Sequence, residues 1–204
     1  MIITKVEVQQ KHKDRVNIYV DGEFFCGMTL FACMKYRLKE GLEIDRERLE
    51  FLRTETERES ACEKGVKYVS KTQKTEKEMR DHLYSKGFEK DAVEYAIKKL
   101  KQYDYINDEL YTKNFVRYKS KTDGKKKIEY ELKTKGISPK IINDTLADFD
   151  FDDGVVRSLA EKYLKGKTRD IKTKQKAYRY LASRGFSSSE ILSAISPFFE
   201  STYY

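Results

Sequence analysis

The heptapeptide HLYSKGF at residues 82–88 decides the fold, because it recurs at a fixed spacing as ELKTKGI (131–137) and YLASRGF (180–186). Five positions keep the same 49-residue interval, four of them apolar and the fifth a glycine. These columns are Leu83/Leu132/Leu181, Gly87/Gly136/Gly185, Phe88/Ile137/Phe186, Val93/Ile142/Ile191 and Ile97/Leu146/Ile195. A period of this length is typical of a tandem repeat protein in which each repeat is one supersecondary unit.

Each repeat is predicted to contain three helices. The first helix is expected at 61–70, 109–120 and 154–164. The second helix ends at the glycine that recurs every 49 residues, since glycine adopts the left-handed conformation of a helix C-cap without steric cost. The third carries the last two apolar columns on one face.

Local signals mark where several of these helices begin. Thr75 and Glu78 have the spacing of a capping box, and the run Ser187–Glu190 starts a helix in the third repeat. Ser138 followed by Pro139 predicts a helix start in the second repeat, because proline suits the first helical position. The repeated columns are therefore interpreted as architecture and not as a site.

The N-terminal segment differs from the repeats. β-Rich runs at 2–8, 15–20 and 23–26, with Asp21-Gly22 between the last two, predict a hairpin in a small sheet. Helices are expected at 29–39 and 45–59. The segment could be a docking module, but we favour a cap over the open end of the repeat array.

The predicted fold is mainly α. Three tandem three-helix repeats at 61–108, 109–153 and 154–204 are expected to form an elongated curved array, preceded by a small α+β segment at 1–60. The composition fits an open shape, because 37% of residues are charged and 39% are hydrophobic.

Composition also bears on location. The richest apolar stretch, 24–34, is too short to span a bilayer, and the N-terminus lacks the basic-then-apolar pattern of a signal peptide. Three cysteines without a close pair argue against a disulfide framework. We therefore expect a cytoplasmic protein. No long heptad pattern demands a dimer, so a monomer is expected.

Positive charge is concentrated in the repeats. Residues 1–60 hold 11 basic and 12 acidic side chains, whereas 61–204 hold 31 and 22. Two bands stand out: 113–140 has 10 basic and 3 acidic residues, and 157–185 has 10 and 2. This distribution is typical of a protein that binds a polyanion or an acidic protein groove.

The candidate binding residues are the basic side chains of these bands. The first band supplies Arg117, Lys119, Lys121, Lys125, Lys126, Lys127, Lys133 and Lys135. The second supplies Lys165, Lys167, Arg169, Lys172, Lys174, Lys176, Arg179 and Arg184. Any single one is more simply a solvated lysine or arginine on a helix face, but the bands as a whole favour a binding surface. Tyr118, Tyr130, Tyr178 and Tyr180 lie among them and could stack on bases, although packing within the repeats is favoured for most.

Sequence signals for catalysis, metals and cofactors are missing. Neither His12 nor His82 has a Cys or His neighbour at zinc spacing. The segment KTDGKKK (121–127) lacks the second glycine and the ending of a phosphate loop. Acidic residues at 150–153 could hold Mg²⁺, but Asp153 before Gly154 fits a helix cap better. We expect no enzyme activity, no metal and no cofactor.

Two stretches resemble a known family. Residues 76–88 (EKEMRDHLYSKGF) and 100–111 (LKQYDYINDELY), separated by an apolar helix, resemble the most recognisable part of RecX, the bacterial regulators of the recombinase RecA. Asp104 stands where the family commonly has Gly, and Met79 where Leu is usual. The resemblance covers about 61–204, and DRVNIYVDGEFFCG (14–27) is similar to the N-terminal segment of longer members.

The resemblance implies a non-enzymatic modulator that lies in the groove of the RecA filament on single-stranded DNA. Such a protein alters the filament's ATPase, strand exchange and stability, usually as an inhibitor. Two alternatives stay open on the residues alone. One is a nucleic-acid-binding protein that acts without RecA, and the other is a scaffold for a different acidic partner.

Overall fold

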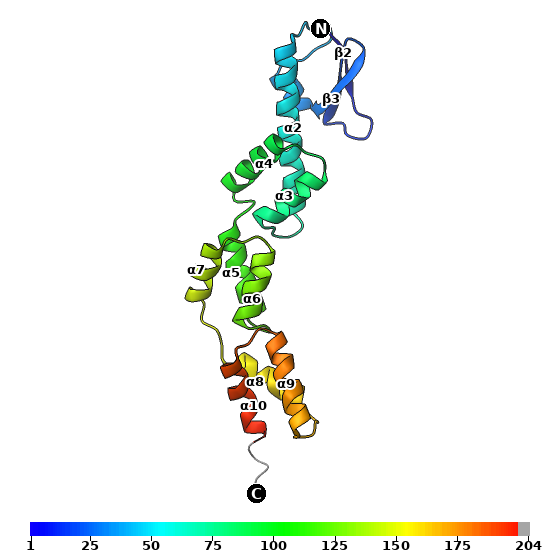
Figure 1. Cartoon of the computed structure of the whole chain (residues 1–204). Coiled ribbons are helices and arrows are strands. Elements are labelled where there is room, and N and C mark those ends of the chain that lie inside the picture. Colours follow the sequence, from blue (N-terminus) through cyan, green and yellow to red (C-terminus); the bar gives the residue numbers. More distant parts are fainter. Residues whose placement is uncertain (200–204) are drawn as a thin grey trace. The chain divides into compact units, whose positions relative to one another are not determined.

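The computed structural model describes residues 1–199, so the last five residues of the predicted third repeat, 200–204, lie outside the described residues. The chain forms two compact units (Figure 1). The first consists of residues 1–73 and 79–106, and the second of residues 74–78 together with the chain from 107 onward. Ten α-helices and one three-stranded sheet are present within 1–199.

The N-terminal sheet is an antiparallel meander of β1 (Ile3–Val8), β2 (Arg15–Val20) and β3 (Glu23–Thr29). The predicted hairpin is confirmed, since Asp21 and Gly22 both have positive φ, 48° and 86°, as a tight turn of this kind requires. Alternating residues of β2 point into a core. This core is formed by Ile3, Val16, Ile18, Val20, Met28, Ala32, Cys33, Leu38, Ile44 and Leu52.

Helix α1 (Leu30–Lys35) is shorter than the helix predicted at 29–39. It stops because Arg37 adopts φ 54°, and the Leu38 N–H then bonds to the Cys33 carbonyl at 3.0 Å. The turn brings Leu38 back into the core of the sheet.

Helix α2 (Arg46–Val69) is a single helix where two were predicted, at 45–59 and 61–70. No Gly or Pro separates the two stretches, so nothing interrupts the backbone bonds. Leu52 belongs to the core of the sheet and Ala61 to the core of the first repeat. The helix therefore joins the N-terminal segment to the first repeat without a linker.

The first repeat adds α3 (Glu76–Ser85) and α4 (Lys90–Gln102). Helix α4 packs on the second half of α2 at Gly65, where a Cβ atom would lie 2.6 Å from Leu100 Cδ1. Glycine is thus needed there for the close approach of the two helices.

The second and third repeats have the same order of helices (Figure 1). Each has its own core of buried side chains. The second repeat consists of α5 (Asp108–Lys119), α6 (Lys125–Thr134) and α7 (Pro139–Asp148). The third consists of α8 (Gly154–Leu164), α9 (Ile171–Ser183) and α10 (Ser188–Ile195), followed by a short 3₁₀ helix (Ser196–Phe198). The prediction of three-helix repeats is confirmed.

The 49-residue columns correspond to one C-cap structure used three times. In the third repeat Gly185 has φ 84°, and the Phe186 N–H bonds to the Leu181 carbonyl at 3.4 Å. The same bonds join Phe88 to Leu83 and Ile137 to Leu132. This is the Schellman pattern, in which an apolar residue after the glycine covers the last turn of the helix.

Most predicted helix starts are confirmed. Thr75 and Glu78 exchange side-chain and backbone hydrogen bonds, both at 3.1 Å, and Ser187 forms a capping box with Glu190. The prediction for Asp153 was wrong. Its side chain makes no cap bond, and the Asp152 carboxylate accepts the Gly154 N–H at 2.7 Å instead, because Asp153 is already helical.

One C-cap lacks the expected glycine. Helix α4 ends in a turn where Asp104 has φ 56°, and the Tyr105 N–H bonds to the Leu100 carbonyl at 2.8 Å. Asp tolerates this left-handed conformation better than most residues, so the tight turn is kept without Gly. Among residues 1–199, no helix has both the length and the apolar character needed to cross a membrane.

Candidate polyanion-binding surface

All sixteen predicted basic residues lie in the second and third repeats, within the second unit. They come from the end of α5, from α6 and from the segment that runs from the end of α8 through α9. The structure divides them into three groups, according to whether the cation is paired with a carboxylate, covers an aromatic ring, or is exposed without an ion pair.

The paired group surrounds Asp123, whose side chain is only 4% exposed. Lys127 Nζ lies 2.9 Å from the Asp123 carboxylate, and Arg184 Nη1 lies 3.6 Å from it. Lys119 lies 3.9 Å from Asp123 and 2.8 Å from Glu131. Arg184 therefore links the third repeat to Asp123 of the second, whereas Lys119 and Lys127 pair within the second repeat.

The same contact uses backbone groups at the start of α6. The Gly124 N–H bonds to the Arg184 carbonyl at 2.8 Å, and the Lys126 N–H bonds to the Gly185 carbonyl at 3.2 Å. The end of α9 thus supplies acceptors for free N–H groups at the start of α6. These N–H groups are already occupied, so they cannot cradle a phosphate.

Lys135 has an equivalent structural role 49 residues before Arg184. Its ammonium lies 2.7 Å from the Glu78 carboxylate and within 6 Å of the ring centres of Tyr111 and Phe115. Desolvation acts to lower the pKa of Lys135, but the bonds to Glu78 and Tyr111 outweigh it and raise that pKa. Lys135 is therefore committed to an internal contact of the second unit.

Aromatic rings hold a second group of cations. Lys167 Nζ lies 3.3 Å from the ring centre of Tyr163, which stacks on Tyr180 at 4.6 Å. Arg184 covers the other ring of this pair at 5.1 Å, so the four side chains form a continuous row. Arg169 lies over Phe198 and Lys174 over Phe199. These contacts stabilise the side-chain positions of cations that remain partly accessible.

Eight of the predicted residues are exposed and form no ion pair in the described part of the chain. They are Arg117, Lys121, Lys125, Lys126, Lys165, Lys172, Lys176 and Arg179. Lys133 is exposed but pairs with Glu129 at 2.6 Å. Lys172, Lys176 and Arg179 follow an i, i+4, i+7 spacing, which places them on one face of α9. This exposed group is the part of the predicted surface that is free to bind a polyanion.

The four tyrosines separate in the same way. Tyr118 and Tyr130 are 73% and 70% exposed, whereas Tyr178 and Tyr180 pack against the core of the third repeat. Tyr130 lies four residues after Lys126 and three before Lys133, hence on the same face of α6. Only the two exposed rings are available for stacking on bases.

The cysteines are unsuited to reactive chemistry. Burial raises the pKa of Cys26 to about 11, and burial also raises the pKa values of Cys33 and Cys62. The reactive thiolate form is therefore scarce at neutral pH.

Sequence reasoning missed two features. Asp123 was the one acidic residue in a basic run, and that isolation was a usable signal that it organises its neighbours. A groove in the first unit, lined by Phe31, Tyr103 and Tyr105 among others, had no such signal because its residues come from distant parts of the chain.

Comparison with known proteins covers nearly the whole chain. Four domain profiles match: the N-terminal domain of regulatory protein RecX at 1–45, and the first, second and third three-helix domains of RecX at 61–100, 107–146 and 153–195. Their bounds agree with the sheet and with the three repeats.

Sequence relatives and solved structures agree with the profiles. Regulatory protein RecX of Clostridium beijerinckii is 38% identical over 95% of this chain and 93% of its own, and that of Clostridium perfringens strain SM101 is 38% identical over 91% and 90%. A crystal structure of regulatory protein RecX superposes with a TM-score of 0.73 at 28% identity, covering 96% of this chain and 98% of that one. RecX from Lactobacillus salivarius gives a TM-score of 0.63 at 28% identity, covering 71% and 97%. With its sheet, its three repeats and nearly its whole length matched, the chain belongs to the RecX family of regulatory proteins.

Proposed function

We propose that this protein is a non-enzymatic modulator of the RecA recombinase that acts as an inhibitor. It binds in the groove of the RecA filament on single-stranded DNA and alters the filament's ATPase, strand exchange and stability. The observation that carries the proposal is the set of eight exposed, unpaired cations on a chain that matches the RecX family over nearly its whole length.

The distribution of these cations suits a filament. The second repeat presents Arg117, Lys121, Lys125 and Lys126, and the third presents the remaining four. Each contact to a solvated anion is weak, but contacts made by linked repeats add through effective concentration. The protein shifts the filament toward the arrangement to which it binds more tightly.

The exposed tyrosines favour a second candidate, a stand-alone nucleic-acid-binding helical-repeat protein. Tyr118 and Tyr130 present open rings next to exposed cations, the combination that binds single strands without sequence preference. Such binding falls steeply with salt and needs no RecA.

Charge reversal at exposed cations tests the proposal. The variants Lys125→Glu/Lys126→Glu and Lys172→Glu/Lys176→Glu are compared for binding to immobilised RecA–DNA filaments and to bare single-stranded DNA. Lys11→Glu/Lys13→Glu is the matched control, because these lysines are also exposed and lie in the N-terminal segment. Lys127 is left unchanged, since its ammonium pairs with buried Asp123 and its backbone lies against Gly185 of the third repeat.

We expect each site variant to bind the filament about tenfold or more weakly, because a charge contact near water is worth ~1 kcal/mol and two are reversed. The control should change by less than about twofold. If the site variants lose binding to bare DNA by a similar factor while their binding to the filament is unchanged, the stand-alone nucleic-acid-binding candidate is favoured. Unchanged binding to the filament and to bare DNA would contradict the assignment of these lysines to the binding surface.

A further inference from the structure

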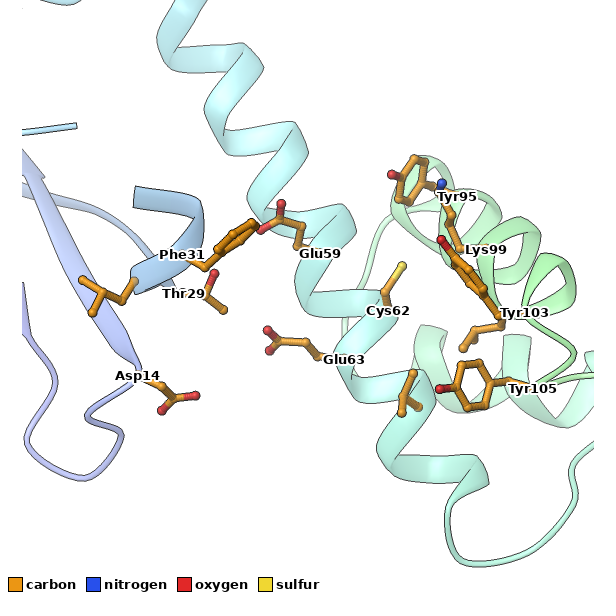
Figure 2. A pocket seen from close by; sticks show the side chains of 13 residues that line it. Asp14, Thr29, Phe31, Glu59, Cys62, Glu63, Tyr95, Lys99, Tyr103 and Tyr105 are labelled. Carbon is orange, nitrogen blue, oxygen red and sulfur yellow. The ribbon is translucent and has the colours of Figure 1, made fainter. Parts of the chain in front are cut away.

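The first unit contains a groove of about 800 Å³ that shares no residue with the basic surface. It is formed by the end of the sheet with α1, by the middle of α2, and by α4 with the turn that follows it (Figure 2). Figure 2 shows Thr29 and Phe31 on one side and Tyr95, Tyr103 and Tyr105 on the other, with Cys62 of α2 between them.

Large apolar groups are exposed along this groove. Phe31 is 76% exposed, and Leu30, Val66, Tyr103 and Tyr105 are also exposed. Five large apolar side chains lining one hollow exceed the scattered single residues that are ordinary on a protein surface. Such a cluster is typical of a surface that binds another molecule.

The turn after α4 positions two of the aromatic side chains of the groove. Tyr103 and Tyr105 flank Asp104, the non-glycine residue held at φ 56°. The left-handed turn places both tyrosines at the edge of the groove. The turn that ends α4 thus also positions two of the aromatic rings that line the groove.

The charges of the groove differ from those of the repeats. Asp14, Glu59 and Glu63 line it, against the single cation Lys99. The Asp14 carboxylate has no hydrogen bond or ion pair in the described structure, and Glu59 is held only loosely, 3.7 Å from Lys35. Glu63 is paired with Arg15 at 2.7 Å. The groove therefore repels phosphate and attracts a cation, in a protein whose net charge is +8.

We propose that this groove binds a short segment of a partner protein that presents a large apolar side chain together with Lys or Arg. The apolar group lies against Phe31, Tyr103 and Tyr105, and the basic group meets Asp14 and Glu59. Nucleic acid is a poor occupant because of the carboxylates. The protein then has two separate binding surfaces, one for a basic segment in the first unit and one for polyanions in the second.

Synthetic peptides test the groove directly. The probes are twelve-residue, fluorescein-labelled peptides with Leu or Phe at helical (i, i+3/i+4) or extended (i, i+2) spacing and Lys at the remaining charged positions. A twin set carries Glu in place of each Lys. Binding is followed by fluorescence anisotropy against the full-length protein.

Matched variants come from the same elements. Phe31→Ser is compared with Met34→Ser, since both residues are exposed on α1, at 76% and 70%, and only Phe31 lines the groove. Asp14→Asn is compared with Glu50→Gln, an exposed residue of α2 outside the groove. Circular dichroism checks that each variant is folded, which the exposure of all four positions favours.

We expect at least one Lys peptide to bind, with about tenfold loss in Phe31→Ser and about threefold loss in Asp14→Asn. Met34→Ser and Glu50→Gln should bind like the unaltered protein, and the Glu twins should bind at least about threefold more weakly. Three results would overturn the proposal: no Lys peptide binds, Lys and Glu peptides bind alike, or Phe31→Ser and Met34→Ser behave alike. Sedimentation showing a dimer that Phe31→Ser dissociates would also overturn it, because a second copy would then fill the groove.

Discussion

Substituting Gly185 with alanine should disrupt the contact between the second and third repeats. Gly185 has φ 84°, and a Cβ atom there would lie 2.5 Å from Lys127 Cβ and 2.9 Å from Lys127 Cα. The backbone of α6 would have to move away. That movement breaks the bonds from Gly124 N–H and Lys126 N–H to the carbonyls of residues 184 and 185.

The magnitude follows from these contacts. A Cβ atom in the left-handed conformation costs ~1–2 kcal/mol. Each of the two lost hydrogen bonds adds ~1 kcal/mol. We therefore expect Gly185→Ala to lower the free energy of unfolding of the third repeat by about 3–4 kcal/mol.

Gly87→Ala is the matched control. Gly87 occupies the same column with φ 83°, but nothing lies within 4 Å of a Cβ atom placed there. Only the conformational cost of ~1–2 kcal/mol applies. Urea unfolding followed by circular dichroism gives the overall loss, and native-state hydrogen exchange of amides in α8–α10 localises it. Equal losses for the two variants would refute the role assigned to Gly185.

Three further predictions concern stability. Asp104→Gly should raise the free energy of unfolding by ~1 kcal/mol, and with it the thermal midpoint, because it removes the steric cost of φ 56°. An unchanged or lower midpoint would contradict this. Desolvation acts to raise the pKa of Glu78, but hydrogen bonds from Lys135 and from the Thr75 N–H hold that pKa below its ordinary value of 4.5. The stability that this carboxylate contributes is therefore present above pH 4.5 and is lost as the pH falls through the folded-state pKa. Glu78→Gln should therefore flatten the acid side of a stability-against-pH curve, and an unchanged slope would count against the pair. Asp123→Asn should cost ~1–3 kcal/mol in urea unfolding because buried charge pairing is lost, whereas Glu129→Gln, at a partly exposed residue, should cost under ~1 kcal/mol.

Features set by local chemistry could be predicted from the sequence. The glycine columns gave the three left-handed C-caps, and the Thr75/Glu78 and Ser187/Glu190 patterns gave capping boxes, because each depends on residues within one turn. The hairpin at Asp21-Gly22 is of the same kind. The error at Asp153 shows the limit of such patterns, since either of two adjacent aspartates could accept the same N–H.

Features set by tertiary contacts could not be predicted. The sequence showed sixteen basic residues in two bands, but not that Asp123 pairs with Lys127 of its own repeat and with Arg184 across a repeat boundary. It did not reveal the groove, whose lining residues run from Asp14 to Tyr105. The continuous α2 was missed for a related reason, because a helix that serves two cores has no composition change at their boundary.

The most direct test of the proposed function is the single-strand-dependent ATPase of the cognate RecA, titrated with this protein at fixed salt. Binding to bare single-stranded DNA is measured in parallel. We predict a dose-dependent fall in ATPase at protein concentrations below those that coat bare DNA, and a weaker fall with Lys125→Glu/Lys126→Glu. No change in ATPase, with salt-sensitive binding to bare DNA intact, would contradict regulation of the filament.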